Sequence, residues 1–254
     1  MGVNGDVFGA TGIELPRDPK PLDRCSSLHL ASQLIDALIF DFDGLILDTE
    51  EPIYQSWAEV YAANGVPLPF EQWVKTVGSN NQEFDPQRHL EVRLGRPLTQ
   101  EEIDRRIARR VELVLAKPLL PGVTDLARAA QAQGMKVGVA SSSSRDWVHG
   151  HLERLGILDL FDCLCSRDDV EHVKPEPDLY LAVLACLGVN ADGAVALEDS
   201  PNGIRSAKRA GLRTVAVPNP ITAGLDLSEA ELRLDSLADV TLPELLNRLQ
   251  HPLT

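Results

Sequence analysis

Residues 37–50 read Ala-Leu-Ile-Phe-Asp-Phe-Asp-Gly-Leu-Ile-Leu-Asp-Thr-Glu, and the predicted fold is built around them. Its apolar start, residues 37–40, predicts a buried strand. The strand ends in two aspartates one residue apart, Asp41 and Asp43, followed by a glycine. In open α/β sheets, ligands bind at the carboxyl ends of the strands. Two close carboxylates need a proton, a cationic side chain or a metal to balance their charge, and carboxylate oxygens suit Mg²⁺.

Length and composition limit the possible classes of protein. The chain has 254 residues, of which 44% are hydrophobic, and this is enough for one sizeable domain or for one domain with a smaller insert. The formal net charge of −14 argues against a basic surface for nucleic acid, and we expect no nucleic-acid partner. No apolar run is as long as a membrane span, and no basic N-terminal region leads into an apolar core. We therefore expect no membrane partner and no signal peptide. As a separate expectation, we take the protein to be a monomer.

The cysteines indicate the redox environment. None of the four forms a CxxC pair, so neither a zinc site nor a redox motif is predicted. We expect them to be small buried thiols, not disulfides, in a reducing cytoplasmic compartment. The four are Cys25, Cys163, Cys165 and Cys186.

The chain divides into three kinds of segment. Residues 1–33 are rich in Gly, Pro and Asp without periodicity, and we expect a poorly ordered extension. Residues 53–117 show helical spacing of apolar residues and no convincing strand, which predicts an all-helical insert. The remaining parts, 34–52 and 118–254, are expected to form one α/β core around it.

One helix of the insert is marked clearly. Thr99 and Glu102 have the spacing of a capping box, so we expect a helix to begin there. Its apolar residues Ile103, Ile107, Val111 and Val114 are predicted to form one buried stripe.

From residue 118 onward, helix and strand patterns alternate. Strands are predicted at 136–140, near 161–165, at 194–197 and at 213–217, and helices are predicted between them and at 242–249. Ser200 can cap the helix that Pro201 opens. Such alternation predicts an α/β fold: a Rossmann-like parallel sheet with helices on both faces.

Four polar clusters follow predicted strands or lie in the loops between them. They are Asp41 with Asp43, the serines at 141–144, Lys-Pro-Glu-Pro at 174–177, and Glu-Asp-Ser-Pro-Asn-Gly at 198–203. In a parallel sheet all these strand ends lie at one edge, so the four clusters can converge.

The clusters suit chemistry on a phosphoryl group. The Asp41 carboxylate could attack phosphorus, with Mg²⁺ held by Asp41 and Asp199 and with Lys174 neutralising the phosphate charge. The Ser141 hydroxyl and backbone N–H groups at a helix start suit phosphate oxygens. Asp43 could give a proton to the leaving oxygen and then activate water.

In their order and residue types, the four clusters resemble the motifs of the haloacid dehalogenase superfamily, most closely its β-phosphoglucomutase-like and sugar-phosphatase members. The resemblance spans about residues 35–220. It implies Asp41 as nucleophile, Asp43 as general acid/base, Ser141 and Lys174 as phosphate binders, and the insert as a cap over the site. It also implies a metal site for Mg²⁺ made by Asp41, the Asp43 backbone carbonyl and Asp199, with Glu198 as a ligand or supporting partner. Further substrate contacts are expected from Gly44, Leu45, Ser142, Asn80 and Asn202.

Two comparisons within that family narrow the expected activity. Dehalogenating members lack the second aspartate, which is present here as Asp43. Mutase members carry a cap histidine and a cap arginine, but here Ile53 and residues 78–81 occupy those places. We therefore expect a Mg²⁺-dependent phosphatase of a small phosphorylated metabolite, such as a sugar phosphate, working through an aspartyl-phosphate. A sugar phosphomutase is the alternative, and a binding module that has lost the chemistry is a third possibility.

Overall fold

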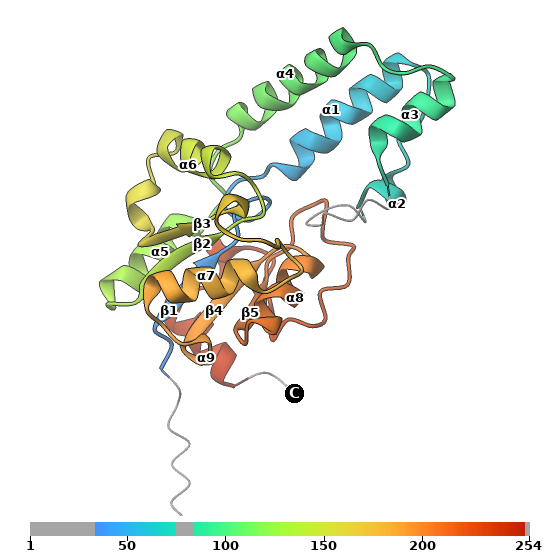
Figure 1. Ribbon diagram of the computed structural model, residues 1–254. Coiled ribbons are helices and arrows are strands. Elements are labelled where there is room, and N and C mark those ends of the chain that lie inside the picture. Colours follow the sequence, from blue (N-terminus) through green and yellow to red (C-terminus); the bar gives the residue numbers. More distant parts are fainter. Residues whose placement is uncertain (1–33, 75–83, 252–254) are drawn as a thin grey trace, which may run out of the picture. The chain divides into compact units, whose positions relative to one another are not determined.

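The computed structural model describes residues 34–74 and 84–251, and its centre is a parallel β-sheet (Figure 1). Within these residues the sheet has the strand order β3-β2-β1-β4-β5-β6, and every neighbouring pair is parallel. The strands are β1 (Ala37–Phe40), β2 (Lys136–Ala140), β3 (Cys163–Cys165), β4 (Ala194–Glu198), β5 (Arg213–Ala216) and β6 (Leu232–Arg233). The expected α/β fold with a parallel sheet is confirmed.

Helices cover both faces of the sheet, as the alternating pattern predicted. They are α5 (Val123–Ala132), α6 (Arg145–Arg154), α7 (Asp178–Leu187), α8 (Pro201–Arg209) and α9 (Leu242–Gln250). The residues of β1 alternate between the two faces. Leu38 and Phe40 join the apolar cluster that includes side chains of α5 and α9, whereas Ala37 and Ile39 join the one that includes side chains of α7. Burial of β1 on both sides explains its continuous apolar sequence.

The helical segment, described at residues 50–74 and 84–116, has an apolar cluster of its own. Its helices are α1 (Glu50–Ala63), α2 (Phe70–Trp73), α3 (Pro86–Leu94) and α4 (Gln100–Ala116). Buried side chains from different helices, such as Trp57, Trp73 and Leu90, pack together in this cluster. The capping box that begins α4 is formed as expected, because the Thr99 side chain and Glu102 each accept a backbone N–H from the other.

The two chain connections of the helical segment bind each other. Lys117 donates to Asp48 Oδ2 at 2.7 Å and also pairs with Glu51. The backbone N–H of Leu120 donates to the carbonyl of Ile46 at 3.0 Å. Asp48 therefore joins the outgoing and returning connections, in addition to accepting the backbone N–H of Glu51 near the start of α1.

The apolar stripe expected on α4 is wrong in part. Ile107 is 39% exposed and Val111 is 37% exposed, whereas Arg106 and Arg110 are half-buried. Apolar spacing alone did not identify the buried side of α4, because arginine can bury its stem and its planar head against aromatic rings.

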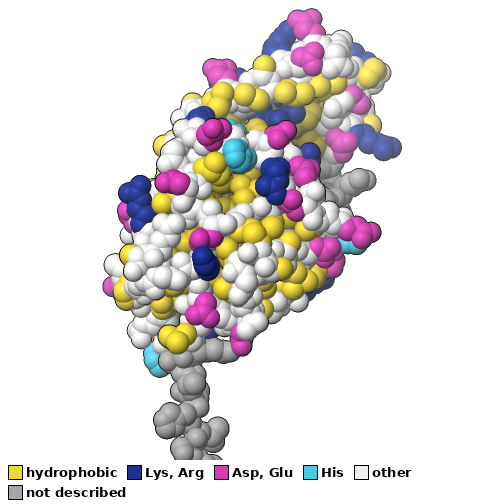
Figure 2. Space-filling model, turned by 60° about the vertical axis from the view of Figure 1, so that its left-hand side comes forward, with side chains coloured by type: hydrophobic (Ala, Val, Ile, Leu, Met, Phe, Trp, Pro, Cys, Tyr) yellow, Lys and Arg dark blue, Asp and Glu magenta, His cyan; other side chains and the backbone are white. Residues whose placement is uncertain are grey.

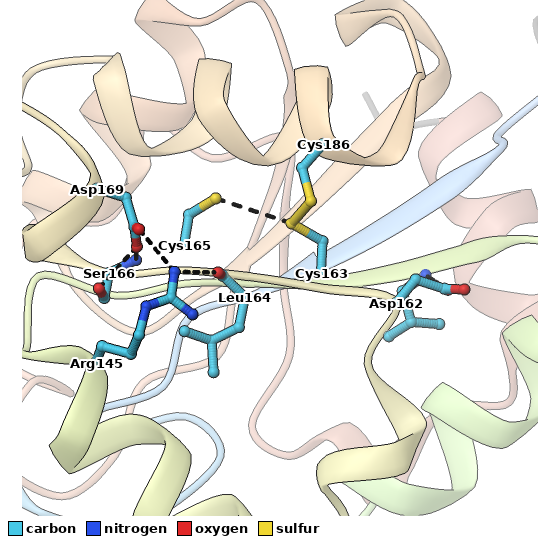
Figure 3. Close-up of a disulfide and its surroundings, with 9 residues drawn as sticks. Arg145, Asp162, Cys163, Leu164, Cys165, Ser166, Asp169 and Cys186 are labelled. Atoms are coloured by element: carbon cyan, nitrogen blue, oxygen red, sulfur yellow. Dashed lines mark hydrogen bonds and ion pairs between the residues drawn. A yellow bond between two sulfur atoms is a disulfide. The ribbon is translucent and has the colours of Figure 1, made fainter.

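The expectation that all four cysteines are free is also wrong. Cys163 on β3 and Cys186 on α7 form a disulfide, with a Cα–Cα distance of 6.3 Å (Figure 3). Cys165 is a free buried thiol whose Sγ lies 3.8 Å from that of Cys163. The sequence could not reveal the pair, because packing of α7 on the sheet brings together residues 23 positions apart. Cys25 lies outside the described residues.

Two surface observations complete the description. On the face in Figure 2, Lys and Arg side chains are interspersed with Asp and Glu side chains. Among residues 34–74 and 84–251, none of the helices combines the length and the apolar character needed to cross a lipid bilayer.

Candidate active site

Three buried carboxylates meet at the carboxyl edge of the sheet. Asp41 follows β1, Glu198 ends β4, and Asp199 follows it. One oxygen from each lies within 4.8 Å of the others. All three side chains are nearly inaccessible to solvent. The parallel register places Phe40 beside Leu197, and this pairing aligns the strand ends that carry the carboxylates.

Lys174 inserts its ammonium group into this cluster. Nζ donates to Asp41 Oδ1 at 2.5 Å, to Glu198 Oε1 at 2.6 Å and to the Ala140 carbonyl at 2.8 Å. Burial alone would lower the pKa of the Lys174 ammonium, but the charges of Asp41 and Glu198 outweigh burial and raise it. Lys174 therefore remains a buried cation that all three acceptors hold in place.

The negative charge of the cluster exceeds what Lys174 can balance. Burial, followed by the charges of Glu198 and Asp43, raises the pKa of Asp41 to about 8 despite Lys174. Burial and the charges of Asp41, Glu198 and Glu50 raise the pKa of Asp199 well above its usual range. At the start of α1, burial and the charges of Asp43, Asp41 and Asp48 raise the pKa of Glu50 to about 8. A second cation would allow these groups to ionise together.

The residues present fit a divalent metal ion with oxygen ligands. Glu198 Oε1 accepts from Lys174 and from Tyr180, whose hydroxyl lies 2.6 Å away. Within the described residues, Glu198 Oε2 is buried and accepts no hydrogen bond. An orphaned carboxylate oxygen beside Asp41 and Asp199 is the kind of donor that Mg²⁺ accepts.

Two glycines make room for the carboxylates. Gly44 has φ +87°, and a Cβ atom there would overlap the Asp199 carboxylate. A Cβ atom at Gly203, in the first turn of α8, would overlap the Glu198 carboxylate. Both positions therefore require glycine, one for its backbone conformation and close contact and the other for close contact alone.

Asp43 lies in a different environment. Its Oδ2 accepts hydrogen bonds from Ser141 at 3.2 Å and from Ser143 at 2.7 Å. Its Oδ1 accepts from the Thr49 hydroxyl and from the Trp147 indole N–H, both at 3.0 Å. Both oxygens of this carboxylate are thus held by side chains from three places: the serine loop, the entry to the helical segment, and α6.

The other predicted substrate contacts have varied positions. Ser142 Oγ is buried without a hydrogen-bond partner among the described residues, so it is available to a ligand. The Leu45 side chain is buried in the apolar core, which leaves only its backbone for such a contact. The Asn202 side chain accepts a hydrogen bond from Arg205 within α8, so its oxygen is engaged by its own helix. Asn80 lies outside the described residues, as do the positions 78–81 compared with the mutase arginine.

Sequence reasoning missed several supporting residues. Asn219 donates to Asp199 at 2.7 Å and to the Gly44 carbonyl at 3.2 Å. It follows β5 at the same edge of the sheet, so the strand-end rule applied once more would have found it. The aromatic donors Trp147, which binds Asp43, and Tyr180, which binds Glu198, carry no such signal. No local pattern distinguishes an aromatic donor from a core residue.

Comparisons with known proteins agree with this geometry. Residues 38–217 match the family described as haloacid dehalogenase-like hydrolase. YhcW of Bacillus subtilis is 43% identical over 85% of this chain and 98% of its own length. Hexitol phosphatase B of Escherichia coli K12 is 34% identical over 83% of this chain and 96% of its own length.

A solved structure has the same fold. It is a mutant of CbbY from Rhodobacter sphaeroides in complex with xylulose-(1,5)bisphosphate. That structure is 30% identical, with a TM-score of 0.66, and the match covers 84% of this chain and 99% of CbbY. The family match spans most of this chain, the relatives include a named phosphatase, and the strand ends carry a buried carboxylate cluster. This chain therefore belongs to the haloacid dehalogenase-like hydrolases and is a phosphoric monoester hydrolase.

Proposed function

We propose that the protein is a Mg²⁺-dependent phosphatase that cleaves a small phosphorylated carbohydrate through an aspartyl-phosphate on Asp41. The observation that carries this proposal is the buried cluster of Asp41, Glu198 and Asp199 around Lys174. The name of hexitol phosphatase B supports the class of substrate.

Asp41 serves as the nucleophile. One of its oxygens is held by Lys174, which leaves the other to attack phosphorus in line with the leaving oxygen. Lys174 also supplies a fixed positive charge beside the phosphoryl oxygens, since its ammonium is buried and cannot move far. The buried hydroxyl of Ser142 provides a further donor to these oxygens, together with Ser141.

Asp43 serves as the general acid and base. Its four donors are Thr49, Ser141, Ser143 and Trp147, and they hold the carboxyl group beside the nucleophile. To give a proton to the leaving oxygen, Asp43 gives up at least one of these four hydrogen bonds and forms one with the substrate instead. It then takes a proton from the water that hydrolyses the aspartyl-phosphate.

Asp41, Asp199 and Glu198 would hold Mg²⁺, with the Asp43 backbone carbonyl as a further ligand. When bound, Mg²⁺ supplies positive charge that offsets the negative charge of the transferring phosphoryl group. The excess of carboxylates over buried cations supports this assignment.

Phosphate release from a panel of hexitol, hexose and pentose phosphates, with and without Mg²⁺, tests the proposal. We expect Mg²⁺-dependent release by the wild type, and a phosphorylated protein trapped by acid quench that is missing in Asp41→Asn. The exposed Asp125→Asn in α5 is the matched control and should behave as the wild type. Wild-type protein that releases no phosphate from any member of the panel would refute the proposed function. Isomerised sugar without net phosphate release would instead favour the phosphomutase.

A further inference from the structure

The two oxygens of the Glu198 carboxylate have opposite surroundings. Oε1 accepts two hydrogen bonds, from Lys174 Nζ and from the Tyr180 hydroxyl, each at 2.6 Å. Oε2 is buried and, within the ranges that the structure describes, accepts none. A carboxylate oxygen has two lone pairs, so Lys174 and Tyr180 together fill Oε1. Oε2 is then the oxygen that Glu198 can offer to a cation.

The neighbouring carboxylate of Asp199 is held in a similar way. Asn219 donates to Asp199 Oδ2 at 2.7 Å, so one of its oxygens also has a neutral donor. Unlike lysine, tyrosine and asparagine hold a carboxylate without adding a positive charge beside it. Supporting partners of this kind orient the ligands of a metal ion and leave their negative charge available to it.

The packing of α7 fixes the Tyr180 hydroxyl. Tyr180 lies in the first turn of α7, and its ring is fully buried in the apolar cluster that α7 shares with the sheet. A Cβ atom at Gly138 of β2 would come within 2.7 Å of Val183, so this glycine lets α7 approach the sheet closely. Near the other end of the helix, the Cys163–Cys186 disulfide joins α7 to β3 (Figure 3). The hydroxyl therefore has little freedom to move.

The number of oxygens that a carboxylate presents affects the choice between Mg²⁺ and Ca²⁺. Mg²⁺ is small and requires a nearly octahedral arrangement with short bonds to oxygen. Ca²⁺ is larger, accepts more ligands and can take both oxygens of one carboxylate. A carboxylate that presents a single oxygen therefore suits Mg²⁺, and one that presents both oxygens suits Ca²⁺ better.

We propose that Tyr180 is a positioning residue that holds Glu198 Oε1, so that Glu198 offers only Oε2 to a cation and the site favours Mg²⁺ over Ca²⁺. Loss of the Tyr180 hydroxyl reopens one acceptor position on Oε1, because Lys174 fills only the other. This inference rests on the proposed function, since it takes Glu198 as a metal ligand. It adds a residue of another helix that sets the choice of metal.

Calorimetric titration of metal-free Tyr180→Phe with Mg²⁺ alone and with Ca²⁺ alone tests the proposal. The substitution removes one hydroxyl group and keeps the buried ring. We expect Mg²⁺ to bind about tenfold more weakly than to the wild type, as when a supporting partner of a metal ligand is lost. Ca²⁺ should lose less affinity, so the ratio of the Ca²⁺ Kd to the Mg²⁺ Kd should fall about threefold or more.

Tyr61→Phe is the matched control. Tyr61 is also fully buried and donates its hydroxyl to the Pro86 carbonyl at 2.8 Å, but it belongs to the apolar cluster of the helical segment. It should bind both cations as the wild type does. A Kd ratio in Tyr180→Phe equal to that of the wild type overturns the proposal, whether both affinities fall together or neither changes. A purely structural role of Tyr180 would not move this ratio.

A second variant applies if Tyr180→Phe does not fold. Glu198→Gln keeps an oxygen for Lys174 and Tyr180 but places an NH₂ group where Oε2 lies, and this group cannot bind a cation. The increase in melting temperature that Mg²⁺ causes in the wild type should then disappear. If Glu198→Gln keeps that increase, Oε2 is not a ligand and the proposal is wrong.

The outcomes separate this proposal from the proposed function. If the wild type binds Mg²⁺ and releases phosphate while Tyr180→Phe keeps the wild-type Kd ratio, only the role of Tyr180 fails. If the wild type binds no Mg²⁺, the proposed metal site fails, and the role of Tyr180 fails with it.

Discussion

Asp41 and Asp43 are separated by one residue, yet they lie in contrasting regions of the site. Asp41 is buried in a cluster of carboxylates with one ammonium group, and its pKa is raised to about 8. Asp43 is surrounded by three hydroxyl groups and an indole N–H, all neutral donors. The difference shows how a strand end can divide two similar groups between two roles, because the chain leaves the sheet there and each group meets its own set of partners.

The largest expected effect separates the two aspartates by their chemistry. Asp41→Asn should lower turnover about 10⁴-fold or more and should form no phosphorylated protein, because the nucleophile is gone. Asp43→Asn should lower turnover about 10² to 10⁴-fold, because proton transfer is lost. Single-turnover kinetics with acid quench should then show slow formation of a phosphorylated protein in Asp43→Asn. If Asp41→Asn formed as much phosphorylated protein as the wild type, Asp41 would not be the nucleophile.

The next effect concerns the cation of the Asp41 region. Lys174→Met should lower the free energy of unfolding by about 3–5 kcal/mol in the absence of metal, because it leaves buried carboxylates without their partner. Urea denaturation measures this difference. Lys136→Met, which removes a half-exposed ion pair with Asp162, should cost no more than about 1 kcal/mol. Similar costs for the two variants would contradict the buried cluster.

A smaller effect depends on pH and Mg²⁺. The folded-state pKa of Asp41 is raised from 3.8 to about 8, so its contribution to stability is present below pH 3.8 and is lost as the pH rises toward 8. The same direction holds for Asp199. Mg²⁺ favours the ionised carboxylates, and it should therefore raise the melting temperature more at pH 8 than at pH 6.

Two variants sharpen that measurement. Asp199→Asn should remove most of the Mg²⁺-induced increase in melting temperature, because it removes a proposed ligand. Asp43→Asn should keep the increase, since its backbone carbonyl is retained and its side chain points to other partners. If Asp43→Asn lost the Mg²⁺-induced increase in melting temperature and Asp199→Asn kept it, the proposed metal ligands would be wrong.

The smallest effect tests the donors around Asp43. Trp147→Phe keeps an aromatic ring beneath the Arg110 guanidinium but removes the indole N–H that donates to Asp43. We therefore expect kcat to fall about threefold to tenfold, as for the loss of one hydrogen bond. The pH profile of kcat should shift as well, because one donor to the Asp43 carboxylate is lost. Trp57→Phe is the control, and it should leave the profile of kcat against pH in place. An unshifted profile in Trp147→Phe would make Trp147 a packing residue.

The amino-acid pattern alone was enough to predict the class of fold and the edge of the sheet at which the polar residues meet. Parallel strands end at one edge, so Asp41, Lys174 and Asp199 could be expected to approach each other from their places along the chain. Helix starts at Thr99 and Ser200 were predictable as well, since a cap depends on residues only three positions apart.

Which atoms meet at that edge depends on the packing of the folded chain. The Cys163–Cys186 disulfide, the Asn219 bond to Asp199 and the inward face of α4 all depend on packing between segments distant in sequence. No periodicity encodes such contacts, because a side chain's partners depend on how helices lie against the sheet and against each other. Asp41 and Asp43 illustrate this dependence, since two positions at one strand end meet different parts of the folded chain.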